Sequence, residues 1–127
     1  MRQGYFISAK IMVGQVRGKG RGVLARSHIA AEELIEYSPM LTCTADEIPK
    51  EGHSFSDYMF HCGDGLALGL GYASLYNHAD EPNCAFHIDA KREAIGFTAL
   101  RRIAAGEELT IDYGIPLWFL KAGAQFT

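Results

Sequence analysis

Short segments in which apolar and polar residues alternate recur along this chain of 127 residues, and glycine-containing turns separate them. Such alternation predicts β-strands, whereas an amphipathic helix would repeat its apolar residues every three to four positions. Strands are expected within residues 5–15, 23–24, 34–41, 66–71, 84–88 and 94–100. The chain is therefore predicted to be mostly β, with several small sheets and little helix.

Glycine and proline set the expected boundaries of these strands. The sequence RGKGRG at residues 17–22 predicts a tight turn between two of them. Pro39 is expected at the edge or the end of a strand, because it has no N–H to donate to a neighbouring strand. Residues 72–83, YASLYNHADEPN, are predicted to form a compact loop closed by polar side chains and a proline.

One internal repeat is present: ARSHIAAEELIEY at residues 25–37 resembles ALRRIAAGEELTIDY at residues 99–113, apart from two inserted residues. Propensity alone would make IAAEEL helical. Each copy, however, lies between strand-like segments that leave no room for a long helix. We expect a repeated turn and strand, and an approximate two-fold relation between the copies.

Composition narrows the class of protein. A chain of this length fits one compact domain, and neither a secretory signal nor a membrane span of about 20 apolar residues is expected from its sequence. A net charge of −3 disfavours nucleic acid and favours a basic partner. Three cysteines without a CxxC spacing indicate reduced thiols. No metal is predicted, because their spacing with the histidines matches no zinc pattern well.

Two segments carry polar groups suited to binding. The glycines of GKGRG, residues 18–22, leave backbone groups open to close approach by a polar small molecule, although a plain hairpin turn is the alternative. The segment lacks the GxGxxG spacing of a nucleotide site. Asn77 and His78 can hydrogen-bond a ligand, and His78 can act as a base or metal ligand. The alternative is that both are satisfied within the fold.

Tyrosines and paired glutamates form the second group of candidates. Tyr113 ends a strand-like run, so its phenol can face a cleft or pack in the core. Tyr58 and Tyr72 add aromatic surface that either packs or lines a channel for an aliphatic chain with a cationic tip. Glu107 and Glu108 are interpreted as a solvated turn, because adjacent strand residues face opposite sides.

Three pieces, GKGRGVLA, SLYNHADEPN and ALRRIAAGEELTIDYG, occur in an order and spacing that resemble the SET domain of protein lysine methyltransferases. The match runs over residues 11–114 and is most similar to minimal single-domain forms, such as the viral histone methyltransferase and short bacterial SET proteins. The resemblance implies a β-clip fold of several small sheets with a C-terminal pseudoknot, in which residues 106–113 pass beneath a loop. It implies one SET domain over residues 1–127, with a short tail at 115–127 and no zinc-binding post-SET segment.

The resemblance also implies S-adenosyl-L-methionine as methyl donor and S-adenosyl-L-homocysteine as product. The implied cofactor-binding residues are Lys19, Gly20 and Arg21, through their backbone, with Asn77 and His78; the catalytic residue is Tyr113; and the channel residues are Tyr58, Tyr72 and Ile111.

Some residues depart from the family pattern. Ala79 stands where larger members carry a zinc-binding cysteine, so Trp118 and Phe119 are expected to form a short hydrophobic lid instead. Arg21 stands where the viral relative has tyrosine, which implies a different substrate preference. Ile111 stands where an aromatic residue often limits the number of methyl groups added, so room for more than one is expected.

The function expected from this resemblance is methylation of a lysine in a histone-like or other basic protein, without direct nucleic-acid or membrane binding. A homodimer is expected from the apolar tail. The location would be cytoplasmic in a bacterium and nuclear or chromosomal in a eukaryote or virus. Two alternatives stay open: a SET-like binding module without turnover, and a β-clip ligand-binding domain.

Overall fold

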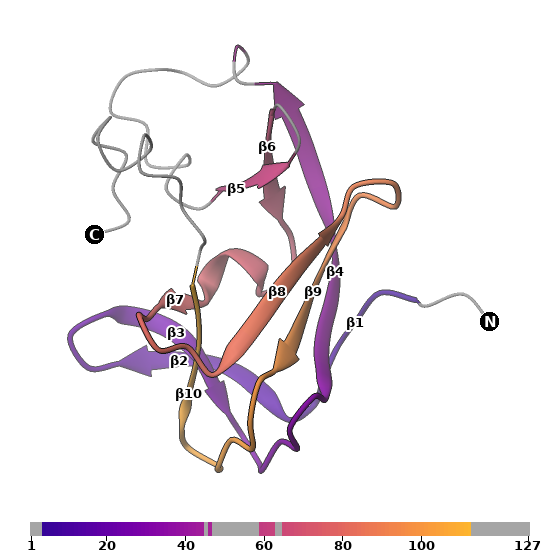
Figure 1. Cartoon of the computed structure of the whole chain (residues 1–127). Coiled ribbons are helices and arrows are strands. Elements are labelled where there is room, and N and C mark those ends of the chain that lie inside the picture. The colour runs from indigo at the N-terminus through magenta and orange to yellow at the C-terminus, as the bar shows by residue number, and fades with distance from the viewer. Residues whose placement is uncertain (1–3, 45, 47–58, 63–64, 113–127) are drawn as a thin grey trace.

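The computed structural model describes residues 4–44, 46, 59–62 and 65–112, and its strands form two sheets (Figure 1). No α-helix occurs among these residues; the named helical element is the 3-10 turn η3 (Ala73–Leu75). The strands are β1 (Phe6–Ile7), β2 (Ile11–Val16), β3 (Gly20–Ala25), β4 (Leu34–Thr44), β5 (Met59–Cys62), β6 (Gly65–Gly69), β7 (Asn77–His78), β8 (Cys84–Asp89), β9 (Ala94–Ala99) and β10 (Glu108–Ile111). The mostly-β prediction is confirmed.

The first sheet has the strand order β5-β6-β4-β9-β8, with β1 added along β4, and the second has the order β2-β3-β10-β7. In the second sheet β10 is antiparallel to β3 and parallel to β7, so the last described strand enters between two strands formed much earlier in the chain. Figure 1 shows β10 beside β3 and β7. This is the place beside the Asn77–His78 strand that the SET resemblance implies for the pseudoknot.

One hydrophobic core joins the two sheets. Ile35, Ile95 and Phe97 from the first sheet belong to the same buried cluster as Leu109 and Ile111 from β10. Each such side chain, when fully buried, contributes about 1.5–3 kcal/mol to folding. Fixing β10 between its neighbours therefore also completes the core.

The internal repeat has an approximate two-fold relation, as expected. Ile29 and Ile103 form an antiparallel bridge in which each N–H donates to the carbonyl of the other at 2.9 Å. Three residues after each isoleucine the backbone is left-handed, with φ of 67° at Glu32 and 88° at Gly106. The two copies therefore turn in the same way on either side of the bridge.

The expected insertion of two residues between the copies is wrong. Glu33 and Glu107, one position after the left-handed residues, each accept a hydrogen bond through Oε1 from the backbone N–H three residues earlier, at 3.0 Å. The copies thus keep one constant offset from Ile29 and Ile103 through this turn. At that offset Tyr37 corresponds to Ile111, and the match of Tyr37 with Tyr113 is lost.

Several predicted boundaries also shift. The glycine turn is shorter than residues 17–22, because β3 already begins at Gly20, which pairs with Val16. Pro39 lies inside β4 instead of at its end or on an edge strand. It is tolerated there because β4 changes partner at this point: Pro39 pairs with Ala94 of β9, and the next residue, Met40, pairs with β6.

The predicted loop at residues 72–83 contains two short ordered elements, η3 and β7. No helix in the described part of the chain is long and apolar enough to cross a membrane.

Candidate functional site

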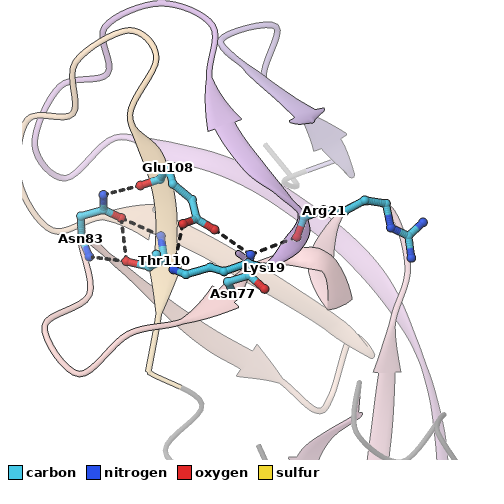
Figure 2. Close-up of polar contacts among 6 residues, drawn as sticks. All are labelled: Lys19, Arg21, Asn77, Asn83, Glu108 and Thr110. Carbon is cyan, nitrogen blue, oxygen red and sulfur yellow. Dashed lines mark hydrogen bonds and ion pairs between the residues drawn. The ribbon is translucent and has the colours of Figure 1, made fainter. Parts of the chain in front are cut away.

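The hairpin β2–β3, the short strand β7 and the strand β10 meet in one place (Figure 2). β10 pairs Glu108 with Leu24 of β3 on one side and Thr110 with Asn77 of β7 on the other. This register places four of the predicted residues, Gly20, Arg21, Asn77 and His78, on the two strands that flank β10, and Lys19 in the turn just before β3.

The tip of the hairpin is exposed and depends on glycine. Gly18 and Gly20 have φ of 79° and 80°, in the left-handed region that side chains disfavour. A Cβ built at either glycine would meet no atom of residues 4–44, 46, 59–62 or 65–112 within 4 Å, so the backbone there does not pack against the described part of the chain. The N–H of Lys19 donates to Val16 within the turn. Among the described residues, the space beside Gly18 and Gly20 is available to a ligand.

Gly22 has the opposite surroundings. It is buried, and a Cβ at this position would lie 2.7 Å from Oε2 of Glu108, 2.7 Å from Cγ2 of Val16 and 2.8 Å from Nδ2 of Asn77. Only glycine lets β3 approach these side chains so closely.

The side-chain amide of Asn77 has a defined orientation. Its Nδ2 donates to the carbonyl of Arg21 at 3.0 Å and to Oε2 of Glu108 at 2.7 Å. The reverse orientation would place the amide oxygen against two acceptors. Both amide hydrogens are therefore used, and Oδ1 has no hydrogen-bond donor within the described residues. Within the described part of the chain, this acceptor stays available to a ligand.

Glu108 connects the three elements. Its side chain is 15% exposed, and Oε1 lies 3.0 Å from Nζ of Lys19 while Oε2 accepts from Asn77. The prediction of a solvated turn is wrong for this residue, although Glu107 does lie at the surface beside Arg101. The alternation in β10 carried the signal: Glu108 and Thr110 share one face, and Leu109 and Ile111 point into the core.

Asn83 fastens the loop after β7 to β10, and the sequence did not single it out as a site residue. It is 4% exposed, and its Nδ2 donates to the carbonyl of Glu108 at 2.8 Å while its Oδ1 accepts from the N–H of Thr110 at 2.8 Å. The side chain therefore pairs with β10 as a neighbouring strand would.

His78 is half-buried between two acidic residues. Nε2 lies 3.5 Å from Oδ1 of Asp80, and Nδ1 lies 3.8 Å from Oδ1 of Asp112. The residue that follows, Ala79, donates its N–H to the carbonyl of Ile111 at 2.9 Å. The backbone of β7 is thereby fixed against the end of β10.

A buried carboxylate supports the segment that leads into β7. Glu36 is 0% exposed and accepts hydrogen bonds from Oγ of Ser38 at 2.6 Å, the hydroxyl of Tyr76 at 2.7 Å and the backbone N–H of Tyr72 at 2.8 Å. Burial raises the pKa of Glu36, and these hydrogen bonds oppose the rise. Burial, and then the adjacent carboxylate, raises the pKa of Tyr76.

The residues expected to line the channel are only partly visible. Tyr72 is half-buried at the margin of the core, where Glu36 holds its backbone, and Ile111 is 0% exposed. Tyr58 and Tyr113 lie outside the described residues. In the described part of the chain, no group of three or more His, Cys, Asp or Glu residues is arranged to hold a metal ion.

Comparison with known proteins gives a consistent result. The model of the SET domain family matches residues 20–114. The chain is 36% identical over 118 residues to the H3 lysine-37 specific histone-lysine N-methyltransferase of Schizosaccharomyces pombe, covering 89% of this chain and 79% of that protein. It is 35% identical over 124 residues to human histone-lysine N-methyltransferase 2B, covering 87% of this chain but 4% of the human protein.

A solved structure agrees in fold. A Plasmodium falciparum protein assigned as a histone methyltransferase superposes with a TM-score of 0.71 at 31% identity, over 84% of this chain and 99% of that one. The family match includes the strands β3, β7 and β10 of the site, and it begins after β2 and the turn that contains Gly18 and Lys19. The chain belongs to the SET domain family.

Proposed function

We propose that this chain is an S-adenosylmethionine-dependent protein-lysine N-methyltransferase that acts on a histone or another basic protein. The observation that carries the proposal is the acceptor Oδ1 of Asn77, which has no donor among the described residues and belongs to an amide that donates to the carbonyl of Arg21, next to the glycine turn. Three of the similar proteins are named as histone-lysine methyltransferases specific for H3 lysine-37, specific for H3 lysine-4, or of type 2B.

The residues present fit the methyl donor. Its amino group needs an acceptor, which Oδ1 of Asn77 offers, and the left-handed turn at Gly18 and Gly20 leaves space where side chains would otherwise stand. In this proposal the backbone of Lys19, Gly20 and Arg21 completes the binding together with His78. When bound, the donor supplies an electrophilic methyl group on a sulfonium.

The catalytic step itself requires that the lysine and the methyl donor be aligned. Methyl transfer to an amine is an in-line displacement, so catalysis depends on holding a neutral lysine nitrogen opposite the bond that breaks. We assign this orienting role to the phenol of Tyr113, which follows the end of β10 at Ile111 by two residues. Tyr58 and Tyr72 are assigned to the lysine channel.

A basic substrate matches the charge of the chain. The net charge is −3, and the carboxylates beside His78 include exposed ones, with the side chain of Asp80 102% exposed and that of Asp112 56% exposed. Complementary charge of this kind steers association more than it adds affinity. A histone substrate would place the protein on chromatin in a eukaryote, and a cytoplasmic protein would be the substrate in a bacterium.

The domain assignment belongs to the same proposal: one SET domain with a core at residues 11–114 and a tail without a zinc-binding segment. Light scattering of the purified chain tests the homodimer. A mass at the monomer value across the micromolar range would rule it out.

Two measurements test the proposed activity. Calorimetric titration should show binding of S-adenosylhomocysteine, and labelled donor should transfer its methyl group to core histones or to proteins of a cell extract. Tyr113→Phe should stop transfer and leave binding intact, whereas His78→Ala should weaken binding. Absence of binding by the unaltered chain contradicts the proposal, and binding without transfer to any protein identifies a SET-like binding module.

The number of methyl groups transferred tests the assignment of Ile111. Because an aliphatic side chain stands where an aromatic one often limits the product, mass spectrometry of the modified lysine should show more than one methyl group. A lysine product that stays monomethylated at high turnover would contradict the assignment of Ile111 as a residue that leaves room for more than one methyl group.

A further inference from the structure

We propose that Glu108 is a positioning residue of the donor site: its carboxylate fixes the orientation of the Asn77 amide, so that Oδ1 faces the ligand. The inference rests on the proposed function for the identity of that ligand. The hydrogen-bond arrangement that carries it is a property of the chain alone (Figure 2).

An asparagine amide has two orientations of nearly equal shape, and its neighbours decide between them. An ionised carboxylate only accepts hydrogen bonds, so it selects the orientation in which Nδ2 points toward it. Glu108 meets Nδ2 of Asn77 at 2.7 Å. The carbonyl of Arg21, at 3.0 Å, selects the same orientation through the second hydrogen. With both hydrogens engaged, rotation of the amide would break two hydrogen bonds and bring acceptors together.

Glu108 can impose this orientation because it is itself held in place. Its backbone pairs with Leu24 of β3, and its carbonyl accepts from Nδ2 of Asn83 at 2.8 Å. The buried Gly22 leaves the space that the carboxylate and the amide occupy. The side chain of Glu108 is 15% exposed, and its hydrogen bond to Asn77 is stronger than it would be in bulk water because the local dielectric is lower.

Lys19 has a secondary part in this arrangement. Its Nζ lies 3.0 Å from Oε1 of Glu108, and its side chain is 41% exposed. Exposed ion pairs contribute little, at about 0–1 kcal/mol. The contact between Glu108 and Asn77 is therefore expected to matter more for ligand binding than the contact between Glu108 and Lys19.

The test is calorimetric titration of the full chain with S-adenosylhomocysteine. Loss of one hydrogen bond to a charged group should weaken binding roughly tenfold or more in Glu108→Ala. Glu108→Gln keeps an oxygen that can accept from Asn77 and should recover most of that loss, and Lys19→Met should lose less than Glu108→Ala. The matched control is Glu107→Gln, because Glu107 is the adjacent glutamate and contacts Arg101 instead of Asn77.

A double-mutant cycle separates positioning from general damage. If Glu108 acts through Asn77, the double variant Asn77→Ala with Glu108→Ala should bind no more weakly than Asn77→Ala alone. Additive losses, or equal affinities in Glu108→Ala and Glu107→Gln, would overturn the inference.

A measurement without ligand keeps the two proposals distinguishable. The side-chain NH₂ signals of Asn77, assigned by their absence in Asn77→Ala, should shift in Glu108→Ala and stay near their positions in Glu107→Gln. If the unaltered chain binds no S-adenosylhomocysteine, the proposed function fails while these signals still report on Glu108. Unshifted Asn77 signals in a folded Glu108→Ala variant would overturn the positioning role itself.

Discussion

Replacement of Glu36 by alanine should destabilise this protein more than almost any other loss of a charge. The carboxylate is 0% exposed, and three donors converge on it from Ser38, Tyr72 and Tyr76. Ser38 is 3% exposed and Tyr76 1% exposed, so these donors would stay buried without a partner after the substitution.

The size of the effect follows from those donors. Each buried donor left without an acceptor costs about 1–3 kcal/mol, so Glu36→Ala should lower the free energy of unfolding by roughly 3–5 kcal/mol. That is a large part of the about 5–15 kcal/mol typical of a whole domain. Glu36→Gln should cost about 1 kcal/mol, because its amide oxygen still accepts and its NH₂ can donate to the hydroxyl of Tyr76.

The pH dependence has a definite sign. Burial raises the pKa of Glu36 above its ordinary value of 4.5, so the carboxyl ionises less readily in the folded chain than in the unfolded one. Well below pH 4.5 the carboxyl is protonated in both the folded and the unfolded chain, so it adds no pH dependence to the free energy of unfolding. As the pH rises from there toward the raised pKa of the folded state, the unfolded chain ionises first, and the free energy of unfolding falls. Glu36→Gln removes this decrease.

Urea denaturation at a series of pH values between about 4 and 8 measures both effects. Glu36→Gln should gain stability relative to the unaltered chain as the pH rises. Glu81→Gln is the same change at an exposed glutamate, and its free energy of unfolding should follow the same pH dependence as that of the unaltered chain. A Glu36→Ala midpoint equal to that of the unaltered chain, or parallel curves for Glu36→Gln, would refute the argument from the buried carboxylate.

Three further predictions follow from single positions. Gly22→Ala should weaken binding of S-adenosylhomocysteine without abolishing folding, because the added methyl group would lie 2.8 Å from Nδ2 of Asn77; calorimetry checks this, and unchanged affinity would contradict it. Asn83→Ala should lower the free energy of unfolding by roughly 2–4 kcal/mol, since the buried N–H of Thr110 loses its acceptor; urea denaturation checks this. Burial raises the pKa of Cys84 to about 12, so its thiol should resist iodoacetamide at pH 8 until the chain unfolds. Rapid alkylation of Cys84 itself in the folded chain would contradict this prediction.

Much of the strand pattern could be predicted from the sequence. The alternation at residues 84–88 and 94–100 became β8 and β9, with bounds that differ by one residue. The repeat centred on Ile29 and Ile103 correctly indicated a two-fold relation. These features are local, since they depend on which side of a pleated strand each residue faces.

The errors lie where the partner is distant in sequence. Pro39 lies inside a strand because the pairing partner of β4 changes from β9 to β6 at that residue. No local sequence pattern predicts such a change of partner. Glu108 was expected to be solvated, yet it contacts Asn77, 31 residues away, and Lys19, 89 residues away. Its burial depends on a parallel pairing with β7 that propensity does not encode.

The sequence by itself determined the strand-rich class, the presence of a glycine turn between β2 and β3, and the set of polar residues from which a donor site can be built. Only the tertiary structure decided how those residues act together. The insertion of β10 between β3 and β7 removes Glu108 from water and turns it toward Asn77, and this leaves one oxygen of that amide open. The physical reason is that the orientation of an amide depends on which donors and acceptors surround it in space, and here they come from strands far apart in the chain.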